Sequence, residues 1–429
     1  MSQHSKAIME PFKLDQLGFV GRGRSRHRPR NEPSLYSGTY PFFQTGDIKA
    51  ANFYLFEYSQ TYNEKGLAQS KLWEPGTLCI TIAANIAETA ILKIKGCFPD
   101  SVVGFIPDSK KADVRFIKYY IDLIKLRMQN VSRGTTQDNL SVDKLLTFEF
   151  LVPPLPTQRK IASILSTYDD LIENNSRRIK ILEEMAQNLY REWFVKFRFP
   201  GHEKARMVDS ALGKVPEGWD VTTLDSVLSI LESGSRPKGG IDPSMRDVPS
   251  IGAENIFGLG KYDFSKEKFV SREFFEKMKR GHINNCDVLL YKDGAKIGRK
   301  SMFRDNFPHS ECCINEHVFI LRTNEKCGQA YLFFWLDQPD ITAGIINLNA
   351  NAAQPGINQK GVKGLTILLP DRKFLDLFDE FVELLLAKLF NLAKKNQVLR
   401  RTRDLLLPKL ISGELDVSDL DIKTGGHMQ

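Results

Sequence analysis

Residues 161–193, "IASILSTYDDLIENNSRRIKILEEMAQNLYREW", carry the pattern that decides the fold of this chain. Two series run through this stretch at a spacing of seven residues. The first comprises Ile161, Tyr168, Asn175, Leu182 and Leu189, and the second comprises Leu165, Ile172, Ile179, Ala186 and Trp193. Two mostly apolar series offset by four residues are typical of the a and d positions of a coiled coil. The stretch therefore predicts a long helix whose seam needs a partner.

A second heptad pattern follows near the end of the chain. Its d series is Phe378, Leu385, Leu392, Leu399 and Leu406, and its a series is Phe374, Phe381, Lys388, Lys395 and Thr402. The seam is thus apolar on one side and polar on the other. Further apolar residues flank both seams: Ile164, Leu171, Met185, Leu377, Leu384 and Val398. We expect them to contact another protein, and the alternative that they cover their own domains stays open.

The chain also repeats itself with a period of about 210 residues. The segment from Lys13 aligns with the segment from Thr222, and "YPFFQTGDI" (40–48) matches "VPSIGAENI" (248–256). Residues 135–154 match residues 352–371 without a gap. Each copy starts with short Ile-, Val-, Phe- and Leu-rich runs separated by turn residues, which predicts a β-rich globule with some helix. The fold class is therefore α+β, with two pseudo-repeated β-rich domains, each followed by a long helix, and the two helices pack as an antiparallel coiled coil.

Composition limits the class of protein. A chain of 429 residues with net charge +8 suits two or more domains and a polyanionic partner. Its six cysteines form no C-x-x-C pair, which favours buried thiols in a reducing compartment. No segment reads as a signal peptide or a membrane span. We expect a cytoplasmic protein.

The strongest binding signal is the basic loop "GRGRSRHRPRN" (21–31), which returns in thinner form as "ESGSRPKGG" (232–240). Arginine can pair with phosphate or with the edge of guanine, and Asn, Gln, Asp and Glu beside it can distinguish bases. The alternative is a solvated basic loop that contacts no DNA. The return of the loop in the second copy disfavours this alternative. The predicted DNA-contacting residues are Arg22, Arg24, Ser25, Arg26, His27, Arg28, Arg30, Gln44, Thr45, Asp47, Lys49, Ser235, Arg236, Lys238, Glu254, Asn255, Lys292, Lys296 and Arg299.

Catalytic motifs are missing from the sequence. It has no phosphate-binding loop, no H-E-x-x-H helix and no adenine methyltransferase motif. The best metal candidate is "HSECCINEH" (309–317), but the following "VFILR" predicts a strand that separates the two cysteines. The matching segment of the first copy is expected to hold neither Cys nor His. We predict no catalytic residue and no metal site.

Two similar units in one chain can pack about a pseudo-two-fold axis. Duplex DNA has the same local two-fold symmetry. Because the two globules differ in sequence, we expect them to read different half-sites. The predicted target is double-stranded, split and asymmetric.

Four stretches resemble the specificity subunits of type I restriction-modification enzymes: "VPPLPTQRKIASILSTYDDLIENN" (152–175), "MAQNLYREWFVKF" (185–197), "GKVPEGW" (213–219) and "RDLLLPKLISGEL" (403–415). The resemblance covers nearly the whole chain. It implies a first target-recognition domain (1–154), a central helix (155–197), a linker (198–219), a second target-recognition domain (220–370), a C-terminal helix (371–415) and a tail (416–429).

The resemblance also implies partners. Two methyltransferase subunits would dock on the chain and methylate adenine N6 with S-adenosylmethionine, and restriction-translocation subunits would join them. The chain itself would hold no cofactor, since S-adenosylmethionine, ATP and Mg would be bound by the partners only. Two alternatives remain: a fused methyltransferase-nuclease fragment, and a coiled-coil adaptor with two β-rich interaction domains.

Overall fold

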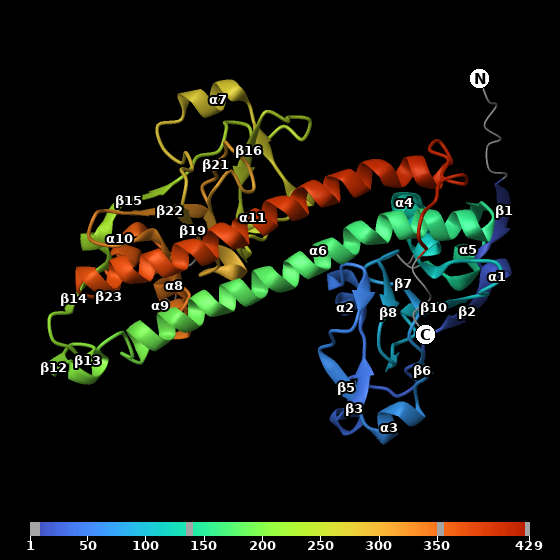
Figure 1. The fold of residues 1–429 in the computed structure, drawn as a ribbon, viewed down its shortest axis with the longest axis horizontal. Helices are drawn as coiled ribbons and strands as arrows, with labels where there is room; N and C mark the ends of the chain where they lie inside the picture. Colours follow the sequence, from blue (N-terminus) through green and yellow to red (C-terminus); the bar gives the residue numbers. More distant parts are fainter. Residues whose placement is uncertain (1–8, 134–139, 350–355, 425–429) are drawn as a thin grey trace. The chain divides into compact units, whose positions relative to one another are not determined.

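The computed structural model describes residues 9–133, 140–349 and 356–424 (Figure 1). The polar turns at 132–139 and 349–358, which could be DNA contacts or ordinary turns, lie largely outside the described residues. The chain divides into two compact units. The first combines Met1–Glu173 with Val398–Gln429, and the second spans Asn174–Gln397. Each unit therefore contains a segment of both long helices, whereas the repeat predicted one helix for each globule.

The first unit is built on a five-stranded sheet in the order β2-β10-β7-β8-β4. Its central strands are apolar without alternation and fully buried, because both faces are covered. A four-stranded sheet, β5-β3-β9-β6, and a pair, β1-β11, complete the unit. The strands are β1 (Glu10–Lys13), β2 (Gly18–Arg22), β3 (Tyr36–Phe42), β4 (Tyr54–Leu55), β5 (Gln60–Tyr62), β6 (Leu72–Trp73), β7 (Leu78–Thr81), β8 (Thr89–Leu92), β9 (Gly96–Cys97), β10 (Val102–Pro107) and β11 (Glu149–Val152).

The helices of the first globule are mostly short. Only α4 is long, and its residues Phe116, Ile117 and Ile121 are completely buried in the same core as the sheet. The helices are α1 (Leu14–Leu17), α2 (Thr45–Ala50), α3 (Glu64–Ala68), α4 (Val114–Arg133) and α5 (Val142–Leu145).

The second unit repeats this topology. Its five-stranded sheet has the order β15-β22-β19-β20-β17, with the same antiparallel pairings and the same parallel last pair as the first sheet. The order β18-β16-β21 forms a second sheet, and β14-β23 forms a pair equivalent to β1-β11. The strands are β14 (Asp220–Thr223), β15 (Leu228–Ser233), β16 (Val248–Ile251), β17 (Gly258–Leu259), β18 (Phe269–Val270), β19 (Asp287–Tyr291), β20 (Lys300–Phe303), β21 (Cys313–Ile314), β22 (Val318–Thr323) and β23 (Thr366–Leu369). The short helices are α7 (Arg272–Lys277), α8 (Gln329–Leu336), α9 (Pro339–Asn347) and α10 (Gln359–Lys363). The predicted α+β fold with two pseudo-repeated domains is confirmed.

Strand register refines the sequence repeat by one residue. Arg22 pairs with Val103, the second residue of β10, and Ser233 pairs with Phe319, the second residue of β22. The next residues, Gly23 and Gly234, are therefore equivalent. A bulge between Leu228 and Ile230 in β15 accounts for the one extra residue in this segment of the second copy.

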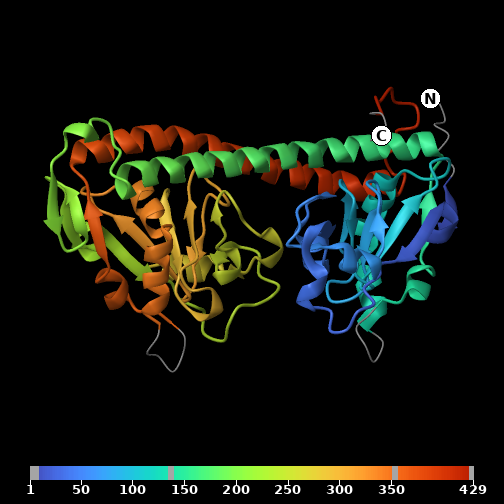
Figure 2. The ribbon, with the colours of Figure 1, turned by 90° about the horizontal axis from the view of Figure 1, so that it is seen from below.

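The long helices are α6 (Leu155–Tyr190), which continues into a π-helical turn (Arg191–Val195), and α11 (Arg372–Ile411). They run antiparallel within each unit. In the first unit Lys160 contacts Ser418 while Asp169 pairs with Arg403, and in the second unit Asn175 bonds to Asn396 while Trp193 packs on Phe378. In Figure 2 the β-rich part of each unit, viewed by itself, lies on one side of its two helix segments.

The predicted seam is right for α6 and wrong by one residue for half of α11. The companion series of α6, from Leu165 to Trp193, is buried. In α11 the predicted a residue Phe381 is 50% exposed, while the predicted d residue Phe378 is buried. The other buried residues between Leu375 and Asn396 are Leu375, Val382, Leu386, Leu389, Phe390, Ala393 and Asn396. Their shift places Asn396, and not a lysine, opposite Asn175, whose amide donates to the Asn396 side chain at 2.9 Å.

The predicted linker is an ordered hairpin. Strands β12 (Met207–Ser210) and β13 (Gly213–Pro216) pair with each other, and Phe199, Val215 and Trp219 are buried in the core of the second unit. The aromatic ring of Phe199 lies 4.4 Å from that of Phe374. These apolar anchors outweigh the polar composition of the segment.

Candidate nucleic-acid interface

A close backbone contact positions the basic loop of the first unit. Gly23 follows β2, and its backbone N donates to the Val102 oxygen at 2.8 Å. A Cβ added at Gly23 would lie 2.2 Å from the Pro99 oxygen, so only glycine allows this approach. The loop that follows is thereby held against residues 98–100.

Asp100 is the carboxylate that faces the arginines of this loop. It pairs with Arg30 at 2.6 Å and with Arg28 at 3.5 Å, and its backbone oxygen accepts a hydrogen bond from Arg22 Nε. Arg28 also donates to the backbone oxygens of Ser25 and His27. Arg28 therefore helps to fold the loop, whereas one carboxylate cannot neutralise five neighbouring arginines.

Arg24, Arg26 and His27 are exposed. The backbone N atoms of Arg26 and His27 donate to Gln69 Oε1, which fixes the turn. Lys71 lies 3.6 Å from the ring of Trp73, and burial together with the charge of Arg24 lowers the pKa of Lys71. Lys71 and the exposed arginines place several cations close together on this surface, which suits a polyanion.

Other predicted residues of the first unit have folding contacts. Ser25 is 5% exposed and its hydroxyl lies 3.4 Å from that of Tyr62. Asp47 accepts the backbone N–H of Gln44 at the start of α2, which begins at Thr45. Lys49 donates to Asn85. Among the described residues no hydrogen bond or ion pair joins Asp47 or Lys49 to the basic loop.

The second unit has an equivalent glycine and an equivalent loop. A Cβ at Gly234 would lie 1.7 Å from the Ile314 oxygen, so the chain passes directly over residues 314–316. This places Arg236 Nε 2.8 Å from Glu316 Oε1. Ser235 is half-buried and Lys238 is exposed in the same loop.

Charged residues from two further segments join this loop. His317 Nδ1 lies 2.9 Å from Asp293, and its Nε2 lies 3.3 Å from Glu316. Lys292 Nζ lies 3.6 Å from Asp293, and the backbone N of Lys292 donates to the His317 oxygen. The loops after β15 and β19 and the loop before β22 therefore meet in one charged cluster, formed by Arg236, Lys292, Asp293, Glu316 and His317.

Glu254 lies beside this cluster. Burial tends to raise the pKa of Glu254, but the hydrogen bond and charge of Lys268 outweigh burial, so the pKa is lowered. Asn255 is 1% exposed and bonds to the backbone of Gly252 and Asp263, which makes it a folding residue. Lys296 is exposed, while Arg299 lies over the Phe257 ring in a different pocket, with Glu183 and Asp337.

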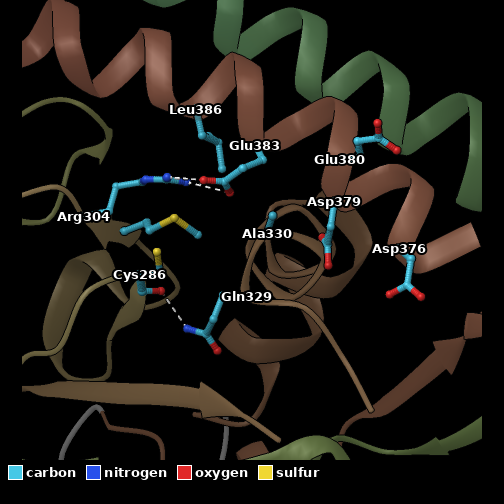
Figure 3. Close-up of a pocket in the computed structure, with 10 residues that line it drawn as sticks. Cys286, Arg304, Gln329, Ala330, Asp376, Asp379, Glu380, Glu383 and Leu386 are labelled. Carbon is cyan, nitrogen blue, oxygen red and sulfur yellow. Dashed lines mark hydrogen bonds and ion pairs between the residues drawn. The ribbon is translucent and has the colours of Figure 1, made fainter. Parts of the chain in front are cut away.

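An acidic groove of about 350 Å³ lies under α11 in the second unit (Figure 3). Glu383 pairs there with the buried Arg304, and burial raises the pKa of Asp379 to about 6. Asp376 and Glu380 add further carboxylates. Four carboxylates beside one arginine give the groove a net negative charge, which disfavours contact with phosphate.

The candidate metal ligands do not converge. His309 pairs with Glu267, His317 pairs with Asp293, and burial raises the pKa values of the Cys312 and Cys313 thiols. Over 9–133, 140–349 and 356–424 no group of three His, Cys, Asp or Glu residues is placed to hold a metal. In the part of the chain that the structure describes, no helix combines the length and apolarity needed to cross a bilayer.

Comparisons with known proteins agree with this architecture. Residues 8–184 match the family described as type I restriction modification DNA specificity domain. The MjaIX specificity subunit of a type I restriction enzyme from Methanocaldococcus jannaschii is 24% identical over 95% of this chain and 94% of its own length. The HindI specificity subunit from Haemophilus influenzae is 22% identical over 95% of this chain and 100% of its own. Over most of its length the chain is therefore similar to specificity subunits of type I restriction enzymes. The S subunit from M. genitalium has the same fold, with a TM-score of 0.57 and 16% identity, over 96% of this chain and 98% of that one.

Sequence reasoning missed the two carboxylates that face the basic loops. Asp100 and Glu316 each lie two residues before the second strand of their sheets, in "CFPDSV" (97–102) and "CINEHV" (313–318). The shared C-x-x-[D/E]-x-V pattern could have identified both. It also corrects the expectation of no cysteine in the first copy, because Cys97 matches Cys313.

Proposed function

We propose that the chain reads a split, asymmetric DNA target for a type I restriction-modification complex. The proposal depends on one observation, the duplication of the unit. In each copy an arginine of the basic loop pairs with a carboxylate at the same place in the fold. The two loops differ in sequence, and so would the half-sites that they read.

The long helices support docking of other subunits. Their exposed apolar side chains include Leu171, Met185, Leu384 and Val398, which are 47%, 50%, 63% and 63% exposed. Apolar side chains spaced along helices suit burial against a partner protein. The occupants we propose are two methyltransferase subunits, joined by restriction-translocation subunits.

In this proposal the chain supplies specificity and not chemistry. S-adenosylmethionine, ATP and Mg act on the partner subunits, and the residues of this chain orient the complex on DNA. The alternative of a fused methyltransferase-nuclease fragment predicts methylation by the isolated chain, and the adaptor alternative predicts no DNA binding in the complex.

The experiment that tests the function is to express the chain with its methyltransferase partner and to map methylated adenines. We expect one two-part target whose halves differ, and no methylation from either protein alone. Methylation by the isolated chain would contradict its non-catalytic role, and a continuous or palindromic target would contradict two different readers.

A further inference from the structure

The two units share an arginine-carboxylate pair at one position of the fold. Gly23 and Gly234 are equivalent by strand register, and each is followed by the basic loop. Asp100 and Glu316 are equivalent because each lies two residues before the strand that pairs with β2 or β15. A carboxylate repeated at this place indicates a role in holding the loop arginines.

Arg236 and Glu316 make the simpler of the two pairs. The contact uses Nε of Arg236, 2.8 Å from Glu316 Oε1. Within the described residues neither Nη group of Arg236 makes a hydrogen bond, and the side chain is 50% exposed. In the first unit, by contrast, Asp100 faces Nη groups of both Arg28 and Arg30.

Glu316 is itself held in place. Its Oε1 also lies 3.3 Å from His317 Nε2, and His317 is anchored by Asp293. Its Oε2 is buried without a hydrogen-bond partner in the described part of the chain. The carboxylate charge is therefore directed at Arg236 and His317, and the Gly234 backbone approach prevents the loop from moving away.

An arginine held at Nε presents its two Nη groups as a planar fork. The same fork fits O6 and N7 of guanine in the major groove, the commonest base-specific arginine contact. A phosphate contact needs a positive charge but not this orientation. Lys238 in the same loop can make such a contact.

We infer that Arg236 reads one guanine of the second half-site and that Glu316 is its positioning residue. The inference rests on the proposed function, and it adds to that function the base that Arg236 reads and the carboxylate that positions this arginine.

The test measures binding of the complex with its methyltransferase partner to duplexes that carry each single base-pair change in the mapped target. Arg236→Lys keeps the charge and removes the fork. We expect discrimination at one G·C pair of the second half-site to fall by about 5- to 150-fold, with the first half-site unchanged. Glu316→Gln keeps the shape and should relax the same position, and the double variant should lose no more than Arg236→Lys alone.

The matched control is Arg206 with Glu217, an exposed pair 3.8 Å apart beside the β12-β13 hairpin. Arg206→Lys and Glu217→Gln should leave every position unchanged. Unchanged specificity in Arg236→Lys would overturn the inference while the function stands. Uniform weakening at all positions with a lower salt slope would also overturn it, in favour of a phosphate contact. A wild-type complex without sequence preference would overturn the proposed function and the inference together.

Discussion

At the residue scale, the arginines of the first basic loop divide into two groups. Arg24 and Arg26 are exposed, whereas Arg28 donates to two backbone oxygens of its own loop. If Arg24 and Arg26 contact phosphates, Ala substitution of either should weaken DNA binding and lower the salt slope of log affinity by about 0.9. Binding titrations of the complex at several salt concentrations measure that slope.

Arg28→Ala should instead loosen the fold of the loop. We therefore expect the loop to be cleaved more readily by proteases and the complex to bind DNA more weakly. Unchanged affinity and slope in both Arg24→Ala and Arg26→Ala would remove this loop from the interface.

Asp379 gives the acidic groove a pH dependence. Burial raises the pKa of this carboxyl from its ordinary 3.8 to about 6, so protonation favours the folded state. Its stabilising contribution is present below about pH 4 and is lost as the pH rises through about 6. At pH 7.5 Asp379→Asn should therefore be more stable than the wild type by about 1–3 kcal/mol, and the difference should vanish toward pH 4.

Urea unfolding at a series of pH values measures this effect. The control Asp376→Asn, at an exposed carboxylate paired with Arg372, should change stability by less than about 0.5 kcal/mol. Equal stability of Asp379→Asn and wild type at pH 7.5 would contradict the raised pKa.

Residue types predicted the basic loops but not the burial of their neighbours. Ser25 and Asn255 have base-reading chemistry, yet both are buried and bonded within the fold. Asp100 and Glu316 were missed because the sequence does not show which arginine each carboxylate faces. Which side chains of two loops pair depends on the register of the strands. Residue types alone do not predict that register.

At the element scale, the heptad pattern predicted α6 well and α11 poorly. In α11 the buried residues Leu375, Phe378 and Val382 are each followed eleven residues later by another buried residue, Leu386, Leu389 and Ala393. An eleven-residue repeat matches a straight helix more closely than a heptad does. Phe374 and Phe381 are apolar residues at predicted a positions, but the side chain of Phe381 is 50% exposed.

Asn396, which is buried, and Asn175, which is partly exposed, form a polar layer in the second unit's helix seam. Asn175 donates to Asn396, and Asn396 donates to Ser176 at 3.2 Å. We expect Asn396→Leu alone to lower the free energy of unfolding by about 1–3 kcal/mol, because Asn175 loses its acceptor. The double change Asn175→Leu with Asn396→Leu should recover much of that loss.

A double-mutant cycle by urea unfolding gives the coupling between the two sites, which we expect at about 0.5–3 kcal/mol. Strictly additive single effects would show that the two amides do not act as a unit.

At the scale of the whole molecule, the internal repeat predicted the duplicated architecture. The matched strand orders of the two five-stranded sheets confirm it. The ordered hairpin at 207–216 was missed, because a few buried aromatic anchors decide its structure against a polar background. The division of both long helices between the units was missed as well, since periodicity describes a helix but not which core it joins.

Docking of the methyltransferase subunits depends on exposed apolar helix residues in this account. Met185→Glu and Leu384→Glu should each reduce the amount of methyltransferase that copurifies with the chain, because a buried charge without a partner opposes association. Leu126→Glu, at a 74% exposed leucine of α4, is the matched control and should copurify normally. Normal copurification of both helix variants would place the docking surface elsewhere.

The most direct test of two independent readers is an exchange of one reader. Residues 1–150 are replaced by the equivalent domain of a relative with a different target, and methylated adenines are mapped in cells that also express the methyltransferase subunit. Direct readout is local to each unit, so one half of the target should change to that of the donor while the other half stays as it was. A change in both halves, or in neither, would contradict the account.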